Sequence, residues 1–203
     1  MSSHLTIKNK AIGNHQVKGS KYLGFAYPII NLNQVKFFLQ ELKSEYSDAS
    51  HICYAYRILN NNNIDEFSTD AGEPRGSAGL PILNVLKSKK LINTAIYVVR
   101  YYGGSKLGIP GLIQSYSRTA EHILENSILT SYIPFKTIEI SFEMKYHSRI
   151  EALIEKYNGI SIHKDFFSEI IYSISLPSEK KNSFLEETQN ITNGSIKILK
   201  NSF

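Results

Sequence analysis

The chain has 203 residues, of which 42% are hydrophobic and 20% are charged, a composition typical of a soluble globular protein. No apolar run is long enough for a membrane helix, the N-terminus lacks the apolar stretch of a signal peptide, and the single cysteine, Cys53, excludes an internal disulfide. We therefore expect a cytoplasmic protein without a membrane segment. The formal net charge of +5 and the sequence pI of about 9.1 are compatible with binding to nucleic acid or to a ribosome surface, and equally with an ordinary solvated surface.

The first part of the chain alternates between strand and helix patterns. Apolar periodicity and turn residues predict, in chain order, a strand over 21–30, a helix over 32–46, a strand over 51–59, a polar turn over 60–63, a glycine-rich loop opening a helix through Leu86, a strand over 94–102, and a second glycine-rich loop opening a helix that runs to Leu129. The order is mixed α/β.

Pro134 marks a predicted domain boundary, because proline ends the preceding helix and the charge balance changes after it. Residues 1–135 carry 14 Lys and Arg against 9 Asp and Glu, whereas residues 136–203 carry 9 of each. The second part predicts strands over 137–144, 160–167, 170–176 and 195–199, a helix opened by a capping box from Ser148 to Glu151, and a helix from Pro177 to Ile191. This β-α-β-β-α-β order is that of a ferredoxin-like domain, so we expect domains over 1–133 and 134–203 and an α+β fold.

Two loops share the spacing Gly-x3-Gly-x2-Gly, at positions 72/76/79 and 104/108/111. Each precedes a predicted helix, and a helix start presents free N–H groups, so both loops suit a polar or anionic partner. Neither loop completes a phosphate-loop or dinucleotide fingerprint, and a kinase, GTPase or dinucleotide enzyme has no support.

The two loops resemble motifs of the YigZ/Impact family. They correspond to its D-G-E-P-x-G-[ST]-A-G-x-P block, here residues 70–81, and its R-Y-[FY]-G-G block, here residues 100–112. With the segments 19–23 and 49–56 the resemblance covers roughly residues 18–130. Two positions depart from the pattern: Ala71 replaces a second aspartate of many members, and Pro110 replaces a usual glycine and fits the start of a helix.

The resemblance implies an N-terminal domain like the second domain of ribosomal protein S5 and a C-terminal domain like the last domain of elongation factor G. It also implies a link to translation, because eukaryotic Impact relatives regulate the starvation-response kinase by binding its activator. Bacterial-type, two-domain members have no settled role, so the resemblance leaves the partner open.

Asp70 and Glu73 are the candidate acid and base of an enzyme. The favoured interpretation is structural: these carboxylates pair with Arg100 or Arg118 and accept loop N–H bonds. His51 and Cys53 share one face of a strand and hint at a Cys/His pair, although a cysteine in an apolar strand is more often part of the core.

Our sequence-based conclusion is a non-enzymatic, translation-associated binding protein whose partner is RNA, the ribosome or a translation-regulatory protein. Its expected contact residues are His51, Tyr54, Asp70, Glu73, Arg75, Gly76, Arg100, Tyr101, Gly103, Gly104, Lys106, Gly108 and Arg118. Tyr101 and Tyr102 beside Arg100 and Lys106 form the best stacking site for bases. The six histidines show no metal-ligand spacing, so we expect no structural metal and no cofactor. The alternatives are a small hydrolase acting on a peptide or a phosphate-bearing substrate through Asp70 and Glu73, and a structural module that pairs through the exposed sheet of the second domain.

Overall fold

The computed structural model describes residues 4–60 and 63–201. The chain divides into two compact units, Met1–Tyr132 and Ile133–Phe203, and each has its own hydrophobic core. The fold class is α+β, as predicted.

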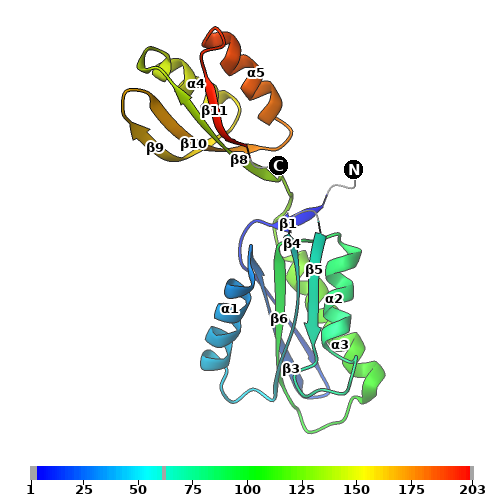
Figure 1. Cartoon of the computed structure of the whole chain (residues 1–203). Helices are drawn as coiled ribbons and strands as arrows, with labels where there is room; N and C mark the ends of the chain where they lie inside the picture. Colours follow the sequence, from blue (N-terminus) through cyan, green and yellow to red (C-terminus); the bar gives the residue numbers. More distant parts are fainter. Residues whose placement is uncertain (1–3, 61–62, 202–203) are drawn as a thin grey trace. The chain divides into compact units, whose positions relative to one another are not determined.

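Unit 1 is built on a five-stranded sheet in the order β2-β3-β6-β4-β5, in which all neighbours are antiparallel (Figure 1). A separate antiparallel pair joins β1 to β7. The elements are β1 (Leu5–Ile7), β2 (Ala11–Val17), β3 (Ser20–Pro28), α1 (Leu32–Glu45), β4 (His51–Asn60), β5 (Asn63–Thr69), α2 (Gly79–Ser88), β6 (Thr94–Tyr101), α3 (Gly108–Glu125) and β7 (Leu129–Ser131).

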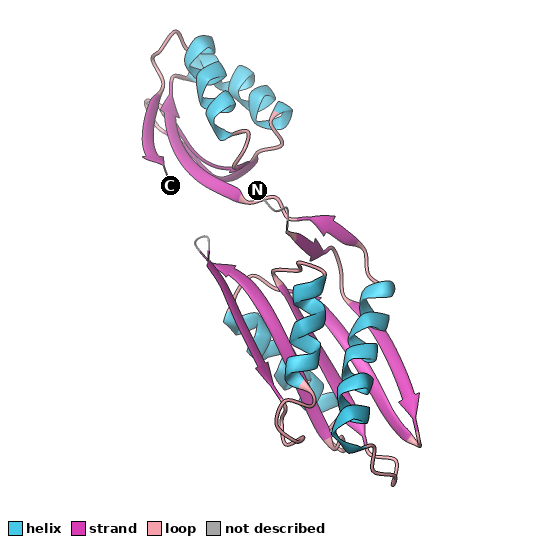
Figure 2. Cartoon of the chain, turned by 90° about the vertical axis from the view of Figure 1, so that its right-hand side faces the viewer, coloured by secondary structure: helices cyan, strands magenta, loops and turns pink. Residues whose placement is uncertain are grey.

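Helices cover both faces of this sheet, with α2 and α3 side by side on one face and α1 on the other (Figure 2). The central strand β6 shows why: Ile96 and Val98 pack under α2 and α3, whereas Tyr97 and Val99 pack under α1. A strand buried on both faces reads as a continuous apolar run, and this run was recognisable in the sequence.

Unit 2 is a four-stranded antiparallel sheet in the order β11-β8-β10-β9, with two helices packed against its apolar side. Its elements are β8 (Phe135–Phe142), a 3₁₀ turn (Met144–Tyr146), α4 (His147–Lys156), β9 (Ile160–Phe166), β10 (Ile170–Pro177), α5 (Lys181–Ile191) and β11 (Lys197–Asn201). The order of elements is β-α-β-β-α-β, as predicted.

Four strands were not predicted: β1, β2, β5 and β7. In β2 the inward positions carry Ala11, Gly13 and His15, which give a weak alternation signal. Gly13 is needed there because a Cβ atom would lie 2.7 Å from the backbone nitrogen of Ile123 in α3. Strand β5 lies at the sheet edge with mostly polar residues, and the polar turn expected before it includes residues 61 and 62, which lie outside the described residues.

Three helix boundaries differ from the predictions. Helix α3 ends at Glu125, short of Leu129, because the chain turns there into the strand pair β1–β7. Helix α4 begins at His147 after Tyr146 with no side-chain cap, so the predicted capping box at Ser148 is wrong. Helix α5 begins at Lys181, because the preceding residues up to Pro177 complete β10.

Candidate functional site

Four connecting segments meet at one end of the unit 1 sheet, the lower end of the unit in Figure 1. Hydrogen bonds join them: the backbone N–H of Gly103 donates to Ser20 Oγ (3.1 Å), and that of Tyr102 donates to Ser50 Oγ (3.0 Å). We call this region the loop end, and define it as residues 17–21, 46–50, 70–78 and 102–107.

The first glycine-rich loop is filled by its own carboxylate. Asp70 accepts hydrogen bonds from the backbone N–H groups of Gly76 (2.8 Å), Ala78 (3.0 Å) and Gly79 (2.9 Å). The partial burial of Asp70 acts to raise its pKa, but these three donors outweigh it and the pKa is lowered. Because these N–H groups include the start of α2, the expectation that both loops present free donors to an external anion is wrong for this loop.

Glu73 and Arg100 form a buried ion pair between the first loop and β6. Arg100 Nη1 lies 2.5 Å from Glu73 Oε1, and only 6% and 3% of their side-chain surfaces are exposed. The Tyr116 hydroxyl of α3 donates to the same carboxylate oxygen at 2.8 Å. The guanidinium also lies over the ring of Tyr22 and over that of Tyr102, at 5.5 and 5.6 Å from their centroids. The pair therefore ties the first loop, the sheet and α3 together.

Arg118, the other cation expected beside these carboxylates, lies elsewhere. Its guanidinium is 3.1 Å from Glu121 and 3.7 Å from Glu125, both on α3 itself. It does not contact Asp70 or Glu73, and the i,i+3 spacing with Glu121 accounts for this local pairing.

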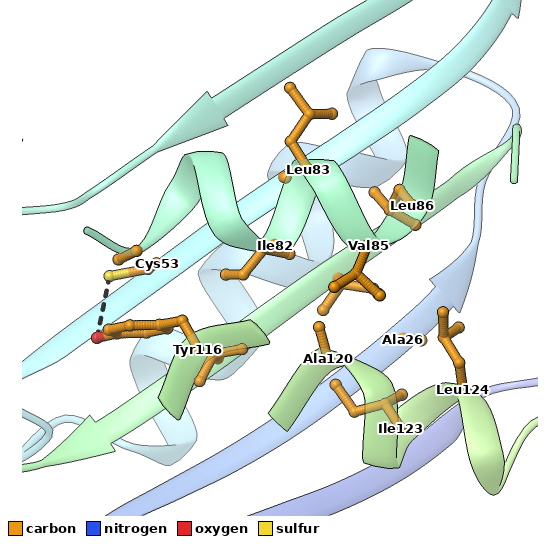
Figure 3. Close-up of a cluster of buried hydrophobic side chains, with 14 of the residues drawn as sticks. Ala26, Cys53, Ile82, Leu83, Val85, Leu86, Tyr116, Ala120, Ile123 and Leu124 are labelled. Carbon is orange, nitrogen blue, oxygen red and sulfur yellow. Dashed lines mark hydrogen bonds between the residues drawn. The ribbon is translucent and has the colours of Figure 1, made fainter. Parts of the chain in front are cut away.

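Cys53 belongs to the buried hydrophobic cluster beneath α2 and α3, where it lies beside Tyr116 (Figure 3). Its Sγ is 3.0 Å from the Asp70 carbonyl oxygen and 3.3 Å from the Tyr116 hydroxyl oxygen. Burial raises the pKa of the thiol to about 12, so it is not a nucleophile at neutral pH. His51 shares this face of β4, but its Nδ1 donates to the carbonyl of Ala71 (2.9 Å), so it also serves the first loop.

The second glycine-rich loop is open to solvent. Gly104, Lys106 and Gly108 are exposed, and α3 begins after Leu107 without a side-chain cap. Gly103 allows the β2–β3 turn to approach closely, since a Cβ atom on it would lie 1.9 Å from the carbonyl carbon of Gly19. The first turn of α3 therefore has no side-chain cap for its backbone N–H groups, which come from Gly108, Ile109 and Gly111 because Pro110 has none.

Four exposed cations surround this open loop region: Lys18, Lys21, Arg75 and Lys106. In the described part of the chain none of the four belongs to an ion pair. Lys18 and Lys21 were not predicted as contact residues. They lie in and beside the β2–β3 turn, and the structure places this turn against Gly103. Nothing in the sequence indicates that contact.

Tyr54 and Tyr101 lie on the other face of the sheet from Arg100. Their neighbours are in the cluster under α1, and the Tyr101 hydroxyl donates to Asp48 Oδ1 (2.9 Å). The structure therefore does not bring these two tyrosines to the same face as Glu73 and Arg100, although Tyr101 reaches the 46–50 segment of the loop end.

Residues 4–60 and 63–201 contain no group of three or more His, Cys, Asp or Glu side chains placed to hold a metal ion. None of the described helices is long and apolar enough to cross a membrane.

Comparison with known proteins identifies the family. Residues 18–124, more than half of the chain, match the Impact N-terminal domain. The chain belongs to the Impact family. It is 27% identical to the Impact family member YvyE of Bacillus subtilis (strain 168), over 96% of this chain and 89% of that protein. It is 28% identical to the Impact family member YigZ of Escherichia coli (strain K12), over 91% of both.

A solved structure has the same overall fold. It is titled as the crystal structure of a hypothetical protein, is 26% identical, aligns over 98% of this chain and 97% of its own, and gives a TM-score of 0.76. The Impact match covers both glycine-rich loops and the Glu73–Arg100 pair. The loop end is therefore built almost entirely from the Impact domain.

Proposed function

We propose that this Impact family member is a translation-associated binding protein and not an enzyme, and that it contacts an anionic partner, RNA or the ribosome, through the loop end. The observation that carries the proposal is the open second loop and the four exposed cations of the loop end, Lys18, Lys21, Arg75 and Lys106. None of the four has an ion-pair partner among the described residues. Phosphate groups bind to such cations and to free helix N–H groups without any chemical step. A role of this kind would place the protein in the cytoplasm.

The engaged carboxylates favour binding over hydrolysis. Asp70 uses both carboxylate oxygens on backbone N–H groups, and Glu73 is held by Arg100 and Tyr116. A general base must reach a proton of the substrate or of water. Both Asp70 oxygens and Glu73 Oε1 already accept structural hydrogen bonds, and the charge of Glu73 is neutralised by Arg100. No observation in the described residues favours the hydrolase.

The charge at the loop end supplies a direct test. Reversing two cations with Arg75→Glu and Lys106→Glu should weaken retention of purified ribosomes or ribosomal RNA. The slope of log K against log salt should fall by about 2, because each lost phosphate contact removes roughly 0.9. The measurement is a filter-binding titration at several salt concentrations.

The matched control is Lys89→Glu with Lys90→Glu. These exposed lysines also carry no ion pair in the described residues, and they follow α2 beside β1, far along the sheet from the loop end. If the control pair weakens binding as much as the loop-end pair, the attraction is non-specific and the proposed surface is wrong. A wild-type affinity that does not change with salt would also contradict an anionic partner.

A further inference from the structure

An aromatic surface lies on the opposite side of the sheet from α2 and α3. Alternation along β4 places Tyr54 and Tyr56 on one face, and the register pairs Tyr56 with Phe67 of the edge strand β5. The buried cluster under α1 takes its members from α1 and the segments on either side of it, and from β3, β4 and β6. Among the described residues none of its members comes from β5. Helix α1 therefore leaves this border of the sheet uncovered. We call Tyr54, Tyr56 and Phe67 the aromatic strip.

The three rings form a continuous surface. The Phe67 ring lies 5.9 Å from Tyr54 and 5.7 Å from Tyr56, where the interplanar angle is 24°. Tyr54 in turn stacks on the buried ring of Tyr97 at 5.4 Å, which fixes the strip to the core. Phe67 is 44% exposed, and both tyrosines are half-buried.

The tyrosine hydroxyls are free to donate. In the described part of the chain neither Tyr54 nor Tyr56 has a hydrogen-bond partner for its hydroxyl, and neither hydroxyl is a buried unsatisfied group. Burial of the rings raises the pKa of both phenols, so both remain protonated donors at physiological pH. A ligand lying on the strip would meet apolar ring surface and two donors.

One carboxylate adjoins the strip, and a second lies farther along the same face of the sheet. Asp65 lies two positions from Phe67 on the same face of β5, and its charge acts on Tyr56. Asp48 lies beyond the other end, where it binds the Tyr101 hydroxyl. Both aspartates are exposed. This arrangement favours a cationic ligand and repels phosphate groups.

We propose that the aromatic strip docks a proline-rich segment of a partner protein that carries Arg or Lys beside its prolines. A polyproline II segment has no internal hydrogen bonds, so its carbonyls can accept from the two tyrosine hydroxyls while its rings pack on aromatic side chains. Asp48 and Asp65 would pair with the flanking cations. A second copy of this chain fits less well, because a symmetric contact at this edge would bring the two Asp65 carboxylates towards each other.

The test uses the full-length protein and a fluorescein-labelled proline-rich peptide with an arginine at each end, followed by fluorescence anisotropy. Phe67→Ser should weaken binding at least tenfold, because it removes the central ring of the strip. The matched control is Ile12→Ser, an exposed apolar residue (53%) on the same face but in the opposite edge strand, β2, where it pairs with Phe25. Its affinity should equal that of the wild type.

A second variant guards against a folding defect. Tyr54→Phe with Tyr56→Phe keeps every ring and removes only the hydroxyls, so about tenfold weaker binding is expected from two lost hydrogen bonds of roughly 0.7 kcal/mol each. Asp65→Asn should weaken binding of the arginine-flanked peptide but not of a peptide in which serine replaces both arginines.

Four results would overturn the proposal. The first is that the wild type binds no peptide up to about 1 mM, and the second is that the Phe67 and Ile12 variants lose affinity equally. The third is that the protein binds labelled oligouridine and Phe67→Ser abolishes this binding. The fourth is that sedimentation shows a dimer that Phe67→Ser dissociates. The last two would assign the strip to nucleic acid or to self-association. Because the strip lies on the other face of the sheet from the loop-end network, Arg75→Glu with Lys106→Glu should leave peptide binding unchanged.

Discussion

Replacing Glu73 by glutamine should destabilise unit 1 far more than a surface substitution. Glu73 is the only hydrogen-bond acceptor of the Arg100 guanidinium among the described residues, and Arg100 Nε is already buried without a partner. Removing the charge leaves a guanidinium with 6% of its side-chain surface exposed and no counter-charge. Breaking a buried pair in this way typically costs about 3–5 kcal/mol.

The expected loss of stability comes from the unpaired charge of Arg100 and not from the removal of the two polar side chains. The double variant Glu73→Met with Arg100→Met should therefore be more stable than Glu73→Gln, because well-packed apolar replacements of buried pairs are often neutral. For a unit of this size, 3–5 kcal/mol corresponds to a fall in melting temperature of about 10 °C or more.

Hydrogen-exchange mass spectrometry provides the assay, since it separates the two units within the full chain. Peptides from β6 and α3 should lose protection in Glu73→Gln, and peptides from unit 2 serve as the internal control. Two results would refute the conclusion that this pair is buried and mutually dependent. One is a fall in the free energy of unfolding of less than about 1 kcal/mol in Glu73→Gln, and the other is a double variant that is less stable than the single one.

Three further predictions concern the loop end and the division into units. Because the pKa of Asp70 is lowered on folding, its contribution to stability is complete above its unfolded pKa of about 3.9. That contribution is lost progressively as the pH falls below this value and through the lower pKa of the folded protein, so urea titrations should show a weaker acid dependence for Asp70→Asn than for the wild type. Gly103→Ala should lower the melting temperature more than Gly104→Ala. The first substitution places a Cβ atom 1.9 Å from the Gly19 carbonyl carbon, whereas the Cβ atom of the second meets nothing within 4 Å and costs about 1 kcal/mol through the positive φ of that position. Equal losses of melting temperature would contradict the close approach of Gly103 to Gly19. A fragment ending at Tyr132 should melt cooperatively by circular dichroism and retain the ribosome or RNA partner, and retention by residues 133–203 alone would move the contact surface to unit 2.

The sequence predicted the elements whose side chains are strongly apolar on a regular period. Strand β6 and helix α1 are examples, because their buried positions carry large aliphatic and aromatic residues. Strands β2 and β5 were missed for the opposite reason: the inward positions of β2 are small or polar, and β5 is an exposed edge. Close packing against α3, which makes Gly13 necessary, leaves no hydrophobic signal in the sequence of β2.

The candidate site was predictable as a pair of loops but not as a surface. The sequence motif predicted that Asp70 and Glu73 accept loop N–H bonds and pair with an arginine, and in the structure Glu73 forms an ion pair with Arg100. Which of two arginines would pair with Glu73 depended on tertiary contacts, and Arg118 instead found Glu121 on its own helix. The register of β2 with β3 brings Lys18 and Lys21 to the loop end, and nothing local to those lysines indicates it.

The two loops share only their glycine spacing, and the residue two positions before the first of these glycines explains why one loop is closed and the other open. Two residues before the first glycine of the spacing stands Asp70 in the first loop and Tyr102 in the second. The aspartate carboxylate reaches the N–H groups at the start of α2, whereas the Tyr102 hydroxyl donates to the Gly104 carbonyl (2.7 Å) and so offers α3 no negative charge. A helix start whose N–H groups already donate to a side chain of its own loop cannot also bind an external anion. A helix start that has no side-chain cap and lies beside Lys106 can bind one. The same backbone pattern thus serves stability at α2 and, on our proposal, recognition at α3.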